Sequence, residues 1–250
     1  GTSEERLADG LSSAGVSPGD VAVATKWHPL CRFASHMLKT IGERKNCLRP
    51  YPIDLYQVHI PFSFSTVRGE AEALAQLVHD GHVRAVGVSN YSARQMIAMH
   101  GCLAEHGVPL ASNQVEYSLL NRRIETDGTL DAAKERGISV IAYSPLAMGL
   151  LTGKFHKDPE LLGKAGLRRW KQLFRKRGMD ASRPVVAALD VIAERYEATA
   201  AQVALNWVTN FHGDGVLAIP GATKPSQAQQ NTGAMAFALK PAEMAQLDEL

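Results

Sequence analysis

Short apolar runs alternate with longer amphipathic segments along most of the chain. Runs rich in β-branched residues predict buried strands, because strands covered on both faces are apolar without interruption. Segments of about 10 to 15 residues between them carry apolar residues at helical spacing. The predicted strands are residues 21–25, 53–58, 83–88, 111–115, 139–142 and 216–219. The predicted helices between them include residues 31–46, 67–80, 92–106 and 129–136.

Local signals support these boundaries and show where the pattern is interrupted. Ser92 with Gln95, and Thr199 with Gln202, have the spacing of a capping box, in which two side chains satisfy the first amides of a helix. An irregular segment, about residues 146–181, follows the fifth strand, and two helices separate it from the sixth. The alternation as a whole predicts parallel βα units.

Repeated βα units are typical of an open doubly wound sheet and of a (β/α)8 TIM barrel. An open sheet that binds a dinucleotide carries GxGxxG after its first strand, and the sequence has no such motif. Residues 149–155, GLLTGKF, resemble a phosphate loop but have one residue too few between the glycines and Phe155 in place of the hydroxyl. We therefore expect an α/β barrel that forms a single domain over residues 1–250.

Composition narrows the class of protein. The chain has 250 residues, of which 45% are hydrophobic, so it can bury a large core. A formal net charge of +2 does not indicate a nucleic-acid partner. The three cysteines are scattered and predict reduced thiols, and no apolar run reaches the roughly 20 residues of a membrane helix. We expect a cytoplasmic protein, with import into an organelle as the open alternative.

Polar side chains lie at or just after the ends of five consecutive predicted strands. In a barrel these carboxyl ends open on one face, where active sites of this architecture lie. Each residue alone is compatible with ordinary packing at a strand end. Together they predict a shared polar pocket, because burying unpaired lysine and amide groups is costly. The residues are Lys26, His59, Ser89, Asn90, Gln114, Tyr143 and Ser144.

The motifs around these strand ends resemble those of one enzyme family. ATKW, DLYQVH, VGVSN, SNQVEYSLLNR, AYSPLAMGLLTGK and IPGATKPSQAQQN are similar to the successive motifs of the aldo-keto reductases, in the same order and spacing. The branch resembles the potassium-channel β-subunits and related bacterial and plant reductases. The resemblance implies NADPH-dependent reduction of a small aldehyde or ketone to an alcohol, with a catalytic tetrad of Asp, Tyr, Lys and His. Lys26 and His59 match the lysine and the histidine.

The chemistry of carbonyl reduction explains why these two residue types are needed. Hydride transfer to a carbonyl leaves an alkoxide, so a general acid must supply a proton. The hydroxyl of a tyrosine has a pKa of about 10 in water. A neighbouring ammonium lowers this pKa, which is the role that the resemblance implies for Lys26. The imidazole of His59 can hydrogen-bond the carbonyl oxygen and orient it.

The resemblance also implies the cofactor-binding residues. Ser89, Asn90 and Gln114 would hold the nicotinamide carboxamide, and Tyr143 would stack on the ring. The implied pyrophosphate residues are Ser144, Pro145, Leu146, Gly149 and Leu151. Those implied for the adenosine end are Gly221, Thr223, Gln227, Gln230 and Asn231. Gln227 and Gln230 stand where many members have arginine and glutamate, so Lys154 and Lys224 are the expected contacts for the 2′-phosphate of NADPH.

The start of the chain bears on completeness. In the family, Asp and Tyr lie in D-x-A-x-x-Y-G directly before a G-x-S-E-E helix, and this chain begins GTSEE, a helix start capped by Thr2 or Ser3. We expect an N-terminally truncated barrel with strands three to eight present and negligible activity in this chain alone. A tyrosine from elsewhere beside Lys26, such as Tyr117, would contradict this. The alternative function is a cofactor-binding regulatory or interaction subunit, or a catalytically inactive fragment.

Two further features have ordinary explanations. Residues 164–177 contain seven basic side chains and predict a solvated helix face, with a phosphate, an anionic membrane or a partner as alternatives. His28, Cys31 and His36 do not match a zinc pattern, so no metal site is predicted. The substrate and the oligomeric state do not follow from the sequence.

Overall fold

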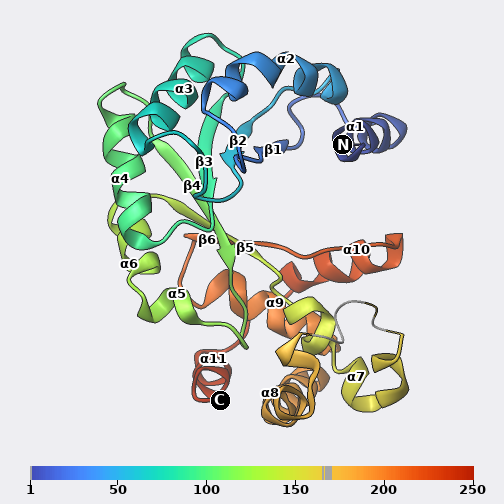
Figure 1. The fold of residues 1–250 in the computed structure, drawn as a ribbon. Coiled ribbons are helices and arrows are strands. Elements are labelled where there is room, and N and C mark those ends of the chain that lie inside the picture. The colour runs from blue at the N-terminus through green and yellow to red at the C-terminus, as the bar shows by residue number, and fades with distance from the viewer. Residues whose placement is uncertain (1, 165, 167–170) are drawn as a thin grey trace. The chain divides into compact units, whose positions relative to one another are not determined.

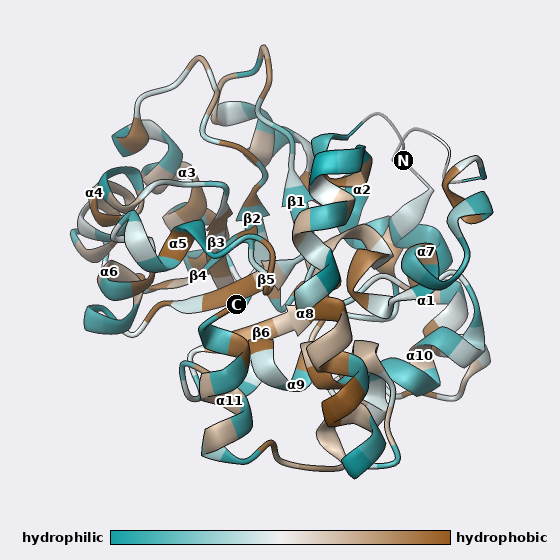
Figure 2. Ribbon diagram, turned by 90° about the horizontal axis from the view of Figure 1, so that it is seen from below, coloured by the Kyte–Doolittle hydropathy of each residue, from teal (hydrophilic) through white to brown (hydrophobic). Residues whose placement is uncertain are grey.

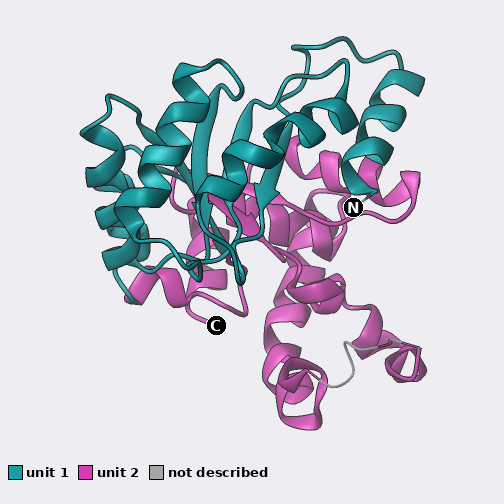
Figure 3. Ribbon diagram, turned by 45° about the horizontal axis from the view of Figure 1, so that its top comes forward, with its two compact units in different colours: residues 1–115, 127–139 teal, residues 116–126, 140–250 magenta. Residues whose placement is uncertain are grey.

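The computed structural model describes residues 2–164, 166 and 171–250 (Figure 1). It contains two compact units, shown in Figure 3: residues 1–115 with 127–139, and residues 116–126 with 140–250. Each unit is therefore built from two separate stretches of the chain. The expected single domain over residues 1–250 stays a prediction.

The first unit, unit 1, is built from parallel βα units. Strands β1 to β4 pair with one another in chain order, each parallel to the next. The strands are β1 (Ala24–Trp27), β2 (Leu55–Val58), β3 (Ala85–Ser89) and β4 (Leu110–Glu116). The helices are α1 (Ser3–Ser13), α2 (Ser35–Leu48), α3 (Val67–His79), α4 (Ala93–Ala104) and α6 (Thr129–Glu135).

The register of these strands divides their side chains between two faces. One face packs on helices: Trp27 is fully buried and donates its indole N–H to His36 on α2, and Asn113 lies beside Met96 on α4. The other face carries the alternate residues. Because paired positions on parallel strands point the same way, residues of equal register form layers across this face. One layer consists of Lys26, Gln57, Gly87 and Ser112.

The second unit, unit 2, contains a strand pair and a helical part. The parallel strands are β5 (Ser139–Tyr143) and β6 (Val216–Ile219). The α-helices are α5 (Arg123–Thr126), α7 (Lys154–Lys157), α8 (Lys176–Arg195), α9 (Ala200–Asn210), α10 (Pro225–Thr232) and α11 (Pro241–Asp248). Short 3-10 helices cover 147–152, 159–162, 172–174 and 233–235. Apolar residues make up most of β5 and β6 (Figure 2).

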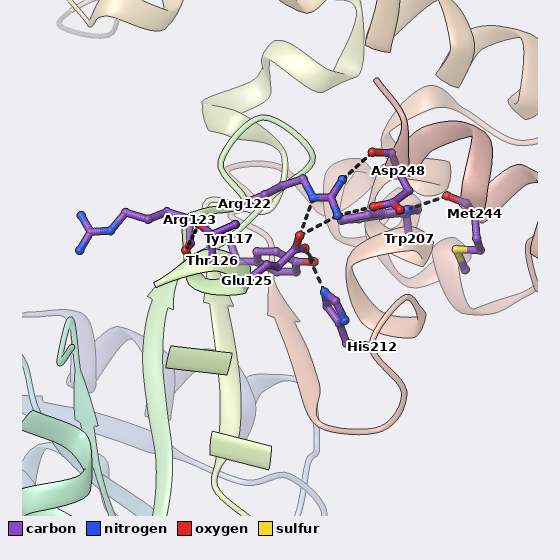
Figure 4. Close-up of polar contacts among 9 residues, drawn as sticks. All are labelled: Tyr117, Arg122, Arg123, Glu125, Thr126, Trp207, His212, Met244 and Asp248. Atoms are coloured by element: carbon purple, nitrogen blue, oxygen red, sulfur yellow. Dashed lines mark hydrogen bonds and ion pairs between the residues drawn. The ribbon is translucent and has the colours of Figure 1, made fainter. Parts of the chain in front are cut away.

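A polar network joins the two ends of unit 2's sequence (Figure 4). Arg122 donates from Nε to the carboxylate of Glu125 at 2.8 Å, and it also pairs with Asp248 on α11. His212 contacts the same Glu125 carboxylate at 2.9 Å. The guanidinium and the other hydrogen bonds outweigh burial and hold the pKa of Glu125 below its usual range. The network therefore anchors α11 to α5 through charged hydrogen bonds.

Several predicted elements are confirmed. The six strands occur within a few residues of the predicted ranges, and β6 has the predicted bounds. Both capping boxes form, at Ser92 with Gln95 and at Thr199 with Gln202. That these are strands three to eight of a barrel stays a prediction.

Two local predictions are wrong. The first helix begins at Ser3, but Thr2 makes no capping hydrogen bond and Ser3 is already helical. The basic segment is not one helix in its described part. There, Lys171 and Arg175 are extended on either side of a 3-10 turn, and α8 begins at Lys176. Residues 165 and 167–170 of that segment lie outside the described residues.

No helix within the described ranges is long and apolar enough to cross a membrane.

Gly87 is the position where the register layer leaves least room. A Cβ built there would clash with the hydroxyl of Ser112 and would lie 3.2 Å from Cγ of Gln57. We expect Gly87→Ala to lower the free energy of unfolding by about 1–3 kcal/mol, because overpacking displaces both neighbours. The helical Gly101 has open space, so Gly101→Ala should be neutral or stabilising by up to about 1 kcal/mol. Unfolding of the two variants at the same urea concentration would contradict the close packing of the layer at Gly87.

Candidate functional site

The carboxyl ends of β2, β3 and β4 place three predicted residues in one layer. Ser89 and Gln114 are register partners, and His59 follows β2 directly, with its backbone N–H donating to Trp27 at 2.9 Å. Ser89 and Gln114 are buried, whereas His59 is exposed. This strand-end layer lies two residues further along the strands than the layer of Lys26 and Gln57, and it is therefore on the same face.

Hydrogen bonds tie these strand ends together through Asn90. Its side-chain nitrogen donates to the carbonyl of His59 at 3.3 Å and to the hydroxyl of Ser89 at 3.1 Å. The Ser89 hydroxyl in turn donates to the carbonyl of Gln114 at 2.9 Å. Asn90 has a left-handed backbone with φ 61°, a conformation that costs energy in most residues and is concentrated at functional sites. The result is a fixed polar frame across three strands.

The charge of Lys26 acts on His59. Burial lowers the pKa of the Lys26 ammonium, which is half-buried. Burial, then the charge of Lys26 and then His28, lower the pKa of His59. The His28 and His59 rings meet edge to face with centroids 5.3 Å apart. The structure therefore brings the two predicted catalytic residues together, and His59 is held in its neutral form near pH 7.

In unit 2, a strained turn follows β5. Ser144, Ala147 and Met148 have left-handed backbones with φ values of 52°, 47° and 56°, although none is glycine. The turn is closed by hydrogen bonds from Ala147 to Ser144 and from Gly149 to the carbonyl of Leu146. Each left-handed residue costs about 1–3 kcal/mol, which persists only where the surroundings fix the conformation. The strain lies in the segment that the family resemblance implies for a pyrophosphate.

The predicted residues around this turn differ in exposure. Tyr143 is half-buried, and burial followed by Glu116 raises its pKa. Ser144, Leu146 and Gly149 are partly exposed. Pro145 is buried, and Leu151 is fully buried, with its backbone N–H donating to Leu146.

The segment after β6 is exposed. Gly221, Thr223, Lys224 and Gln230 are exposed, and Asn231 is half-buried. Gln227 has a structural contact that its sequence position does not reveal. Its side-chain oxygen accepts both the backbone N–H of Thr223 at 2.7 Å and the hydroxyl of Thr223 at 3.1 Å. Gln227 therefore orders the loop before α10.

The comparisons with known proteins agree with the motifs. The model of the family described as Aldo/keto reductase family matches residues 1–250. This chain belongs to the aldo/keto reductase family.

Two relatives illustrate the similarity and its extent. The chloroplastic pyridoxal reductase of Arabidopsis thaliana is 37% identical over 177 residues, 71% of this chain and 46% of that protein. The aldo-keto reductase str7 of Strobilurus tenacellus is 34% identical over 200 residues, 79% of this chain and 57% of that protein. The chain thus spans about half the length of these two relatives.

Solved structures extend the similarity to the fold. A glycerol dehydrogenase from Gluconobacter oxydans has a TM-score of 0.84 at 29% identity, over 98% of this chain and 76% of that chain. An aldo/keto reductase from Klebsiella pneumoniae, solved with NADP and acetate, has a TM-score of 0.74 at 27% identity, over 98% of this chain and 74% of that chain. Together with the parallel βα units, these similarities fit the α/β TIM-barrel fold.

The strand-end layer of this aldo-keto reductase fits a nicotinamide carboxamide. Such a group offers both donors and acceptors, and the side chains of Ser89 and Gln114 offer both in return. Gln114 is 8% exposed, and within the described ranges its own carboxamide makes no hydrogen bond. A nearly buried amide needs such partners, so this donor set is suited to binding a polar ligand.

Tyr117 is not suited to the role of the proton donor. Its hydroxyl donates to the carboxylate of Glu125 at 2.5 Å (Figure 4). Burial, followed by that carboxylate, raises the pKa of Tyr117. A general acid for carbonyl reduction needs the opposite shift.

A cavity of unit 1 lies elsewhere. A cavity of about 670 Å³ is lined by residues that include Tyr51, Ile53, His82 and Arg84. These residues precede β2 and β3, so the cavity lies at the amino ends of the strands, away from His59 and Ser89. Sequence reasoning missed His28 and Gln57, the two side chains that flank the predicted pair; the Q of the QVH motif was the available signal for Gln57.

The influence of the Lys26 charge on His59 is testable by titration. Removing the ammonium in Lys26→Met should raise the pKa of His59, because a positive charge that opposes its protonation is lost. Burial and His28 remain, so the pKa should stay below its ordinary value. NMR titration of the His59 Cε1 proton, assigned with His59→Gln, measures this. Lys39→Met, which removes an exposed lysine on α2, serves as the control. An unchanged pKa in Lys26→Met would place the ammonium too far away to act.

Proposed function

We propose that this chain forms the cofactor and carbonyl site of an NADPH-dependent aldo-keto reductase that reduces an aldehyde or ketone to an alcohol. The observation that carries the proposal is the closeness of Lys26 to His59, whose pKa it lowers, beside the fixed frame of Asn90, Ser89 and Gln114. A protein that only bound a nucleotide would need the frame but not the half-buried ammonium. The family membership of the whole chain supports the same reaction class.

Each residue has a distinct task in this proposal. The bound cofactor supplies a hydride. His59, neutral near pH 7, donates a hydrogen bond to the carbonyl oxygen and orients it. Lys26 favours the ionised form of a neighbouring acid and so lowers that acid's pKa. The tetrad's aspartate and tyrosine are assigned to no residue of this chain.

The proposal gives the predicted residues different parts of the cofactor to bind. Ser89, Asn90 and Gln114 hold the carboxamide, and Tyr143 stacks on the ring. The strained turn presents backbone groups to the pyrophosphate, with Leu151 supporting it from the core. At the adenosine end, Gln227 is already bonded to Thr223, so Lys154 and Lys224 carry the positive charge that favours the 2′-phosphate.

The compartment remains a proposal as well. Three unpaired cysteines favour a reducing compartment such as the cytoplasm. The Arabidopsis relative is chloroplastic, which makes an organelle the alternative.

Substitution of Lys26 in the full-length protein tests the function. Lys26→Met should leave the NADPH dissociation constant within about twofold and lower kcat by at least about 100-fold, because the ammonium acts on the acid and not on the nicotinamide. Lys39→Met should match wild type in both. Fluorescence titration and turnover of a panel of aldehydes and ketones provide the two measurements. Normal turnover with an unchanged pH profile in Lys26→Met would remove the proposed role.

The same titrations with NADH examine cofactor preference. Lys154→Ala should weaken NADPH several-fold and leave NADH unchanged, since the contact is to the extra phosphate. Lys157→Ala is the matched control, because Lys157 is already paired with Asp190 at 2.9 Å. An unaltered ratio of the two dissociation constants would exclude Lys154 from the phosphate contact.

A further inference from the structure

Gln57 is a fully buried amide in the middle of a strand. It is the register partner of Lys26 on β1 and of Gly87 on β3, and its side chain points to the same face as theirs. Gly87 leaves the space that the Gln57 side chain occupies. A buried amide at this place must satisfy its donors and its acceptor inside the protein.

The donor half of the amide has defined partners. The side-chain nitrogen of Gln57 donates to the carbonyl of Val88 at 3.4 Å and to the hydroxyl of Ser112 at 3.3 Å. A backbone carbonyl only accepts, so the contact with Val88 fixes which end of the amide is nitrogen. Val88 lies on β3, and Ser112 lies on β4.

The acceptor half has no partner. The side-chain oxygen of Gln57 is buried and makes no hydrogen bond in the described part of the chain. Because the nitrogen faces β3 and β4, the oxygen faces the other way, toward β1. Lys26 is the residue of β1 at this register, and neighbouring parallel strands are only about 4.8 Å apart. The Lys26 ammonium is half-buried, and no hydrogen bond from it is found among the described residues.

We propose that Gln57 is a positioning residue whose buried side-chain oxygen accepts a hydrogen bond from the Lys26 ammonium and holds it charged beneath His59. The contact requires a change of the Lys26 rotamer, which the flexible stem of a lysine allows. The contact relieves an unsatisfied acceptor and stabilises a partly desolvated cation at once. This inference rests on the proposed function, since it gives Lys26 the fixed place from which it acts on the acid.

Titration of the Lys26 amine tests the contact without cofactor or turnover. Competitive acylation with acetic anhydride across a pH series, read by mass spectrometry of the Lys26 peptide, gives the midpoint of deprotonation. Gln57→Leu should lower this midpoint by about one pH unit, because the ammonium loses its acceptor. Gln57→Glu should raise it, because a carboxylate accepts more strongly. Ser112→Ala, which leaves the Gln57 oxygen in place, should match wild type, and Lys39 provides the exposed reference in every sample.

The two glutamine variants keep the test decisive if one of them fails to fold. The variant to be considered is the one that unfolds at the same temperature as the wild-type protein. If the deprotonation midpoint of Lys26 is unchanged in that variant, the contact is overturned. In the full-length enzyme, the pH at which kcat falls on the alkaline side should shift in the same direction as the deprotonation midpoint of the Lys26 amine. A shift of the Lys26 midpoint without a shift in the kcat profile would overturn the positioning role. Absence of reductase activity in the wild-type enzyme would count against the proposed function and not against the contact.

Discussion

The parallel register of β1 to β4 is the constraint on which the candidate site depends. Parallel pairing points partners such as Lys26 and Gln57 to the same face, so one register layer places charged and amide groups side by side. A slip of one residue would send Lys26 toward the helices and Trp27 toward the site. Burial of Trp27 against α2 therefore fixes the register that the chemistry needs.

Desolvation gives these layers their chemical character. Lys26 and His59 both carry lowered pKa values, with burial as the leading cause in each. Two basic groups held close together at a partly desolvated site oppose each other's protonation, so the imidazole, with the lower ordinary pKa, gives up its charge first. The ammonium then needs an acceptor, and the buried oxygen of Gln57 is the one that the register supplies. Lys26 thereby stays positively charged, and His59 stays neutral and able to donate a hydrogen bond.

The sequence predicted what periodicity and local spacing encode. The strands and both capping boxes follow from short-range patterns, and Lys26 and His59 stood out because polar residues end apolar runs. For Gln57 the sequence offered only its place in the QVH motif, since the role of this residue depends on which residues flank it across the sheet. The left-handed backbones of Ala147 and Met148 could not be predicted, because neither residue type favours that conformation. The cap expected at Thr2 does not form, because Thr2 has φ −79° and ψ 2° instead of the extended backbone from which a capping side chain accepts an amide hydrogen bond.

The most direct test of the account maps where the cofactor binds. Addition of NADP⁺ to the isotopically labelled full-length protein should shift the amide resonances of His59, Asn90 and Gln114 at the carboxyl ends of the strands. The amides of Tyr51 and His82, which line the cavity at the opposite ends, should stay unchanged. The reverse pattern, with shifts at the cavity and none at the strand ends, would contradict the account.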